Sequence, residues 1–157
     1  MRTNLSSQIS LNRVSTRYYK PENTIERSVL TRFEKIPTNI YETVDEGVSC
    51  IADEIIRKVQ ERQRDGKFCT IATGTGASLR PLFAELVRRH KEEGVSFRNV
   101  VVFNLYEYYP LTEPNNSSFN QLNELFLKQV DIDPQNVFTL NGTIPQEGVI
   151  DHCHLYE

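Results

Sequence analysis

A short loop between a predicted strand and a predicted helix carries the residues best suited to hold an anion. The strand is expected over 67–72 and the amphipathic helix over 79–90. Gly74 and Gly76 permit a tight backbone, and the free amide groups at a helix start suit a phosphate. The hydroxyl donors of the loop are Thr73, Thr75 and Ser78. Spacing alone leaves a second interpretation open, in which the glycines only turn the chain from strand to helix.

This loop differs from both common phosphate-binding fingerprints. A Walker A loop has Lys before its closing Ser or Thr, whereas Ala77 precedes Ser78 here. The dinucleotide fingerprint has a third glycine where this chain has Leu79. The sequence therefore disfavours both of these nucleotide-binding classes.

A second loop with candidate functional side chains follows the next predicted strand. The run 100–103 is continuously apolar, as expected of a parallel strand buried on both faces. It leads into Asn104–Pro110, which contains three tyrosines and Glu107. Ligands collect at the carboxyl ends of strands in an open parallel sheet, so this loop should lie beside 73–78 and form a pocket with it. The alternative, in which the tyrosines cover the sheet edge and Glu107 faces water, also stays open.

The elements around these loops predict an α/β fold with a parallel sheet flanked by helices. Thr43 and Glu46 form a capping box that begins a helix of about 20 residues, and Gly66 ends it. Another helix follows Asn115–Ser118, a third strand is expected at Val137–Leu140, and a last helix begins within the final dozen residues. The apolar positions of the first helix are Val44, Val48, Ile51, Ala52, Ile55 and Val59.

The first 40 residues are expected to precede the domain proper, which spans 41–157. Residues 1–30 are polar with scattered basic side chains, which favours a solvated leader over a nucleic-acid-binding arm. Residues 28–41 are apolar enough to lie on the domain as an extended segment.

Composition narrows the partners that we expect. Charged residues make up 25% of the 157 residues and the formal net charge is −3, so overall charge attracts neither nucleic acid nor an anionic membrane. No apolar run approaches the ~18 residues of a transmembrane helix, and the start lacks a signal-peptide core. Three cysteines without a pattern suit a reducing compartment, and a cytoplasmic location is expected. His152 and His154 would point to different faces of a helix without matching ligands upstream, so no metal site is expected.

Three motifs, in order along the chain, resemble glucosamine-6-phosphate deaminases. They are Thr75–Ser78, the stretch Gly94–Tyr108 that contains Phe-Asn-x-x-Glu-Tyr, and the stretch Val130–Gly142. The resemblance extends from about Tyr41 to Glu157. The related 6-phosphogluconolactonases share the fold and the phosphate loop but match the second motif less well.

The resemblance implies a Rossmann-like α/β fold and an enzyme that converts glucosamine 6-phosphate and water into fructose 6-phosphate and ammonia. The phosphate-binding residues would be Thr75, Gly76, Ala77 and Ser78, and Tyr106 and Glu107 would occupy the catalytic motif. No cofactor is expected, because the chemistry needs only proton transfers. The implied partner is a small-molecule sugar phosphate, and assembly into a homo-oligomer is left open.

Two features depart from the family pattern. The family has an Asp that moves a proton between C2 and C1 of the opened sugar, and this chain has Tyr106 there. A phenol with a pKa of about 10 is almost wholly protonated at neutral pH, so Tyr106 is a poor base. Glu107 is the next candidate, although adjacent residues on an extended segment point in opposite directions. Family members also have a second half with further catalytic groups, so we expect this chain to be an N-terminal portion that is inactive by itself.

Three functions follow from these observations. The first is the N-terminal part of a glucosamine-6-phosphate deaminase. The second is a non-catalytic module that binds or senses sugar phosphates, because Tyr106 occupies the position of the base. The third is a hydrolase of the 6-phosphogluconolactonase type on the same fold.

Overall fold

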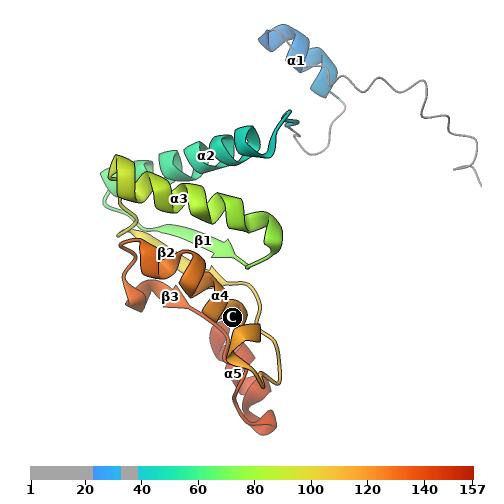
Figure 1. Cartoon of the computed structure of the whole chain (residues 1–157), viewed down its shortest axis with the longest axis vertical. Coiled ribbons are helices and arrows are strands. Elements are labelled where there is room, and N and C mark those ends of the chain that lie inside the picture. Colours follow the sequence, from blue (N-terminus) through green and yellow to red (C-terminus); the bar gives the residue numbers. More distant parts are fainter. Residues whose placement is uncertain (1–22, 33–38) are drawn as a thin grey trace, which may run out of the picture. The chain divides into compact units, whose positions relative to one another are not determined.

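The computed structural model describes residues 23–32 and 39–157 (Figure 1). The chain divides into two units, 1–42 and 43–157, and each is described by itself. The first unit contains helix α1 (Thr24–Thr31), whose N-cap Asn23 accepts a hydrogen bond from the amide of Glu26 at 2.9 Å. The expected extended segment is therefore wrong for residues 28–31, because this cap starts a helix that includes them. The rest of the expected leader, 1–22, lies outside the described residues.

The second unit is built on a parallel sheet in the order β1-β2-β3. Strand β1 (Cys69–Thr73) pairs with β2 (Val100–Asn104) along its whole length, with Cys69 opposite Val100. Strand β3 (Val137–Phe138) pairs with β2 at Val102 and Phe103 only. Parallel pairing and the helices beside it confirm the predicted α/β fold. The third strand is shorter than the predicted 137–140, because its pairing with β2 ends at Phe138.

The second unit contains four helices beside the sheet: α2 (Val44–Arg64), α3 (Arg80–Glu93), α4 (Ser118–Leu125) and α5 (Val149–Tyr156) (Figure 1). The hydroxyl of Thr43 accepts a hydrogen bond from the amide of Glu46 at 3.2 Å, which confirms the predicted start of α2. Helix α3 ends at Gly94 in the left-handed conformation, with φ of 72°. Short 3-10 turns lie at Ala77–Leu79, Pro114–Asn116, Leu127–Gln129, Pro134–Asn136 and Gln146–Gly148.

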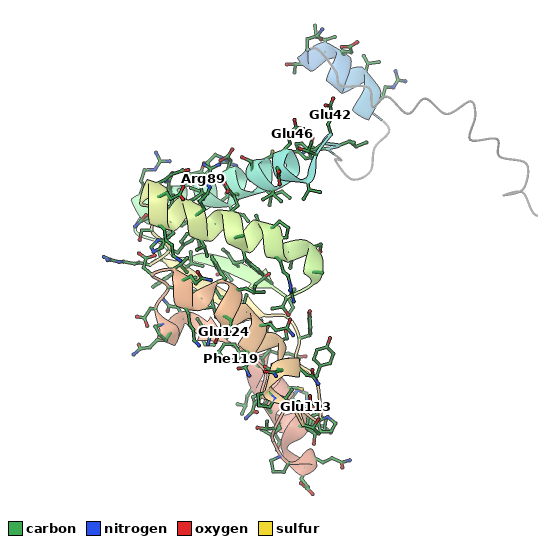
Figure 2. All side chains as sticks on the ribbon, in the orientation of Figure 1. Glu42, Glu46, Arg89, Glu113, Phe119 and Glu124 are labelled. Carbon is green, nitrogen blue, oxygen red and sulfur yellow. The ribbon has the colours of Figure 1, made fainter. Side chains whose placement is uncertain are left out.

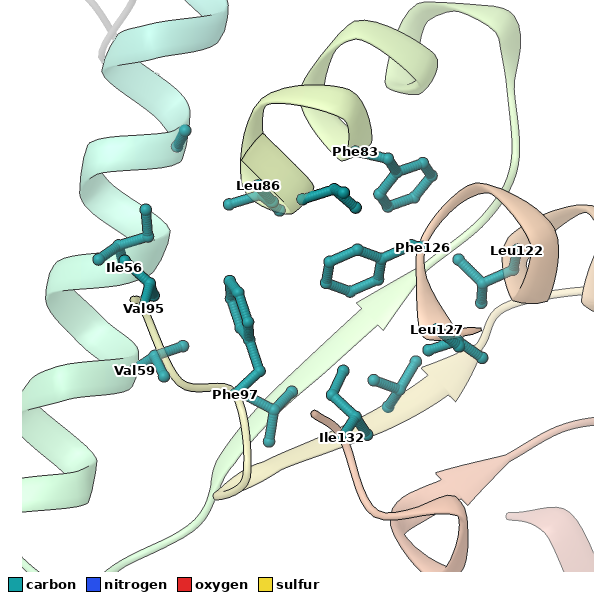
Figure 3. Close-up of a cluster of buried hydrophobic side chains, with 14 residues drawn as sticks. Ile56, Val59, Phe83, Leu86, Val95, Phe97, Leu122, Phe126, Leu127 and Ile132 are labelled. Atoms are coloured by element: carbon teal, nitrogen blue, oxygen red, sulfur yellow. The ribbon is translucent and has the colours of Figure 1, made fainter. Parts of the chain in front are cut away.

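The hydrophobic core lies between the sheet and helices α2, α3 and α4 (Figure 3). Phe126 stacks on Phe83 with ring centres 5.4 Å apart and meets Phe97 edge-on at 5.7 Å. The contribution of α2 to the core begins at Ala52, and Val44 and Ile51 are exposed although the periodicity placed them on the apolar face. Their exposure shows that the first turns of α2 do not reach the core.

The second face of the sheet is only partly covered in the described residues. Phe103 of β2 stacks on Phe138 with ring centres 4.9 Å apart, and Tyr156 of α5 meets Phe103 edge-on. Thr70 and Ala72 of β1 are exposed on the same face. The expectation that β2 is buried on both faces is therefore correct for one face and only partly correct for the other.

Candidate functional site

The loops after β1 and β2 lie side by side at the carboxyl edge of the sheet. The amide of Leu105 donates to the carbonyl of Thr73 at 2.9 Å, and the amide of Thr75 donates to the Tyr106 hydroxyl at 3.3 Å. A Cβ atom on Gly74 would stand 2.5 Å from the Tyr106 ring, so the second loop can approach this closely only because residue 74 is glycine. The predicted juxtaposition of the two loops is confirmed.

The predicted phosphate-binding residues divide into an exposed part and a buried part. Gly76, Ala77 and Ser78 are exposed, and the last two begin the 3-10 turn that leads into α3. The first amide groups of such a helical segment have no partner within the helix, so they can meet a ligand. Thr75 is only 7% exposed, and both its amide and its hydroxyl have partners inside the protein.

A chain of buried polar groups connects the two loops to α4. The hydroxyls of Thr75 and Ser118 are 3.0 Å apart, and the Ser118 hydroxyl donates to Oδ1 of Asn104 at 3.3 Å. Asn104 in turn donates through Nδ2 to the carbonyl of Tyr106 at 2.9 Å. Asn104 and Ser118 are both fully buried. Sequence reasoning used Ser118 only as part of a helix cap, because nothing in the local pattern shows that it contacts Thr75.

Glu107 accepts hydrogen bonds from four donors, three of them at the start of α4 and the fourth in its neighbour Tyr108. Its Oε1 accepts from the amides of Ser118 and Tyr108 at 2.8 and 3.0 Å. Its Oε2 accepts from the Ser117 hydroxyl and the Phe119 amide at 2.7 and 3.1 Å. This carboxylate thus caps the N-terminus of α4, and the alternative in which Glu107 simply faces water is wrong.

These donors also determine the protonation of Glu107. Burial by itself would raise the pKa of Glu107, but the hydrogen bonds from Ser117 and from the amides of Ser118 and Phe119 outweigh it and lower the pKa below its usual value. An ionised carboxylate has about four lone-pair sites, and four donors already use them. In this geometry Glu107 has little capacity to take a proton from a substrate.

Tyr106 contacts the phosphate loop through its hydroxyl, which accepts a hydrogen bond from the Thr75 amide. Its pKa lies below the usual tyrosine value, mainly because of the adjacent Thr75 side chain and then because the Thr75 amide donates to the phenol oxygen, while burial and the charge of Glu107 oppose this effect. Among the described groups that act on it, none is a Lys or Arg.

A cavity of about 560 Å³ has Glu107 in its lining. It is lined by residues of the segment 107–120 and of the turn 139–143, and Phe119 of α4 is among them. Gly142 closes one wall, because its carbonyl accepts from the Leu111 amide at 2.8 Å. None of the residues 75–78 lines this cavity, so it is distinct from the expected pocket between the two loops.

The two histidines considered as metal ligands lie in α5, and one of them has a structural partner. His152 accepts a hydrogen bond from the amide of Asn141 at 2.9 Å. Within the described ranges no group of three or more His, Cys, Asp or Glu is arranged to hold a metal ion. In the same ranges, no helix combines the length and apolar character that crossing a bilayer requires. Within the described residues, Cys50, Cys69 and Cys153 form no disulfide bond.

Comparisons with known proteins point to one family. No protein-family model matches the chain. A Bacteroides thetaiotaomicron protein named "Putative glucosamine-6-phosphate deaminase-like protein" is 58% identical over 158 residues, which span all of this chain and 24% of that protein. Glucosamine-6-phosphate deaminase 1 of Giardia intestinalis is 35% identical over 99 residues, which span 60% of this chain and 37% of the relative.

A solved structure agrees with these sequence relatives. The structure of a monomeric glucosamine-6-phosphate deaminase matches 74% of this chain and 46% of its own chain, with a TM-score of 0.65 and 26% identity. This chain therefore spans between a quarter and about half of the length of these relatives. In both sequence and fold it is related to the glucosamine-6-phosphate deaminases.

Proposed function

We propose that this chain forms the phosphate-binding part of a glucosamine-6-phosphate deaminase-like protein and binds glucosamine 6-phosphate. The observation that supports this most strongly is the hydrogen bond from the Thr75 amide to the Tyr106 hydroxyl, which joins the two loops at the carboxyl edge of the sheet. The sequence relatives support the choice of ligand, since their names specify glucosamine 6-phosphate.

The phosphate is proposed to lie against Thr75, Gly76, Ala77 and Ser78. The exposed amides of the last three would donate to phosphate oxygens, with the Ser78 hydroxyl beside them. Thr75 would fix the shape of the loop from inside, because its side chain is buried. Backbone amides at a helix start bind anions without a lysine, which fits a loop that has none between 73 and 78.

We further propose that the residues of this chain bind the sugar phosphate without turning it over. Deamination needs a base that moves a proton between C2 and C1 of the opened sugar. Tyr106 stands at that position, and its neighbour Glu107 already accepts four hydrogen bonds. The same observation favours a second candidate function, a non-catalytic sugar-phosphate sensor. We also propose a cytoplasmic location, since three cysteines without a pairing pattern in the sequence suit a reducing compartment.

Calorimetric titration of this chain tests the binding proposal. Glucosamine 6-phosphate should bind with one site per chain, while glucosamine without the phosphate should not. Ala77→Glu should abolish binding, because it places a carboxylate in the exposed loop. The matched control is Ala84→Glu, an equally exposed position on α3 that should leave the affinity unchanged. Absence of glucosamine 6-phosphate binding, or equal effects of the two variants, would refute the proposed site.

An ammonia assay on the same samples tests the catalytic part. We expect no ammonia from glucosamine 6-phosphate with the unmodified chain. Ammonia release by the unmodified chain would show that a base is present and would refute binding without turnover. Release by Tyr106→Asp alone would instead show that Tyr106 is what prevents the reaction.

A further inference from the structure

Ser118 is the point at which three separate segments of the site meet. Its side chain is fully buried at the first residue of α4. Its hydroxyl contacts the Thr75 hydroxyl at 3.0 Å and Asn104 Oδ1 at 3.3 Å, and its amide donates to Glu107 at 2.8 Å. Through these contacts Ser118 reaches the phosphate loop, the end of β2 and the loop that follows β2.

The directions of the hydrogen bonds that join Thr75, Ser118 and Asn104 follow from the side-chain carbonyl oxygen of Asn104. Asn104 Oδ1 is a carbonyl oxygen and can only accept a hydrogen bond. The Ser118 hydroxyl therefore donates its only hydrogen to this oxygen. The Thr75 hydroxyl must then donate to the Ser118 oxygen, because Ser118 has no second hydrogen to give. The side-chain amide of Asn104 is held in this orientation, since its Nδ2 donates to the carbonyl of Tyr106.

We infer that Ser118 is a positioning residue for the phosphate loop. Being fully buried, it does not touch a ligand and acts through Thr75. Removal of its hydroxyl leaves the Thr75 hydroxyl and Asn104 Oδ1 buried without their partner, and such groups turn toward other partners or toward water. Because Thr75 is next to Gly76 in the exposed loop, rotation of Thr75 displaces the amides proposed to hold the phosphate. This inference rests on the proposed phosphate site.

The test measures affinity for glucosamine 6-phosphate by calorimetry in Ser118→Ala and in Thr75→Val. Each single variant should weaken binding about tenfold, the effect of roughly one hydrogen bond. The double variant should bind no more weakly than either single variant, because both changes break the same contact. Thr75→Ser, which keeps the hydroxyl, should retain most of the affinity that Thr75→Val loses.

Ser96→Ala is the matched control for a purely structural effect. Ser96 also donates from a partly buried hydroxyl, to Asp131 at 2.7 Å, but it precedes β2 and so lies at the opposite edge of the sheet. We expect this variant to lower thermal stability and to bind glucosamine 6-phosphate with unchanged affinity and stoichiometry. Equal loss of affinity in Ser96→Ala and Ser118→Ala would overturn the positioning role.

The other outcomes separate this inference from the proposed function. Additive losses in the double variant, or unchanged affinity in Ser118→Ala, overturn the role of Ser118 while the phosphate site stands. Failure of the unmodified chain to bind refutes the proposed function and this inference with it. If Ser118→Ala does not fold, Thr75→Val must still bind more weakly than Thr75→Ser, and equal affinities would overturn the inference.

Discussion

Replacement of Glu107 by Gln should destabilise the fold although the two side chains have the same shape. In whichever orientation the amide group sits, its NH₂ faces two donors: either the Ser118 and Tyr108 amides, or the Ser117 hydroxyl and Phe119 amide. Two hydrogen bonds to a charged group are lost, each of about 1.5 kcal/mol. Partial rotation of the Ser117 hydroxyl recovers some of this, so we expect a loss of about 2–3 kcal/mol.

Urea denaturation at pH 7 measures this loss directly, and Glu113→Gln is the control. Glu113 is exposed just before the 3-10 turn at 114–116, and its replacement should change the free energy of unfolding by less than about 0.5 kcal/mol (Figure 2). Equal stabilities of Glu107→Gln and the unmodified chain at pH 7 would refute the capping role of the Glu107 carboxylate.

The pH dependence gives a second check on the same carboxylate. Its pKa is lower in the folded chain than in the unfolded chain, so its contribution is complete above the unfolded pKa of about 4.3. That contribution disappears as the pH falls through the folded pKa. The difference in stability between the unmodified chain and Glu107→Gln should therefore shrink as the pH is lowered below about 4.

Two further predictions concern packing and surface charge. Gly142→Ala should destabilise the chain by at least about 2 kcal/mol in urea denaturation, because its new Cβ would overlap the backbone carbonyl of Tyr108 and crowd Leu111; Gly148→Ala, with open space around it, should be nearly neutral. Hydrogen bonds from Arg88 and then Arg89 lower the pKa of Glu85 to about 2. Glu85→Gln should therefore lower the free energy of unfolding by about 1 kcal/mol at pH 7, and this difference should decline as the pH falls from about 4.5 toward 2. Urea denaturation at several pH values measures the difference. A difference that is independent of pH would contradict the pairing of Glu85 with Arg88 and Arg89.

The position of the site was predictable because it depends on features with local sequence signals. Two apolar strands in a strand–helix–strand unit must be parallel neighbours, so the loops that follow them lie at the same edge. The cap at Thr43 and the left-handed Gly94 are equally local, and both are present. Helix α1 was missed because a short polar segment with one Asn cap gives a weak signal.

The roles of individual side chains were not predictable in the same way. Glu107 and its three partners on α4 are separated by ten to twelve residues, and no spacing rule indicates a contact between a loop and a helix start that far along the chain. The contact between Thr75 and Ser118 joins residues that are 43 positions apart. Such contacts depend on how the elements pack, which a sequence pattern does not encode locally.

The short pairing of β3 has a consequence for the order in which the native chain opens. Two residue pairs join β3 to β2, whereas five join β1 to β2, so β3 and α5 should exchange amide hydrogens with solvent earlier than β1, α3 and β2. Tyr156 of α5 donates its hydroxyl to the carbonyl of Asn104 at 2.6 Å. Because Asn104 also contacts Ser118, a transient detachment of α5 would reach the proposed phosphate site through Asn104, and if sugar phosphate binds there as proposed it would in turn slow exchange in α5.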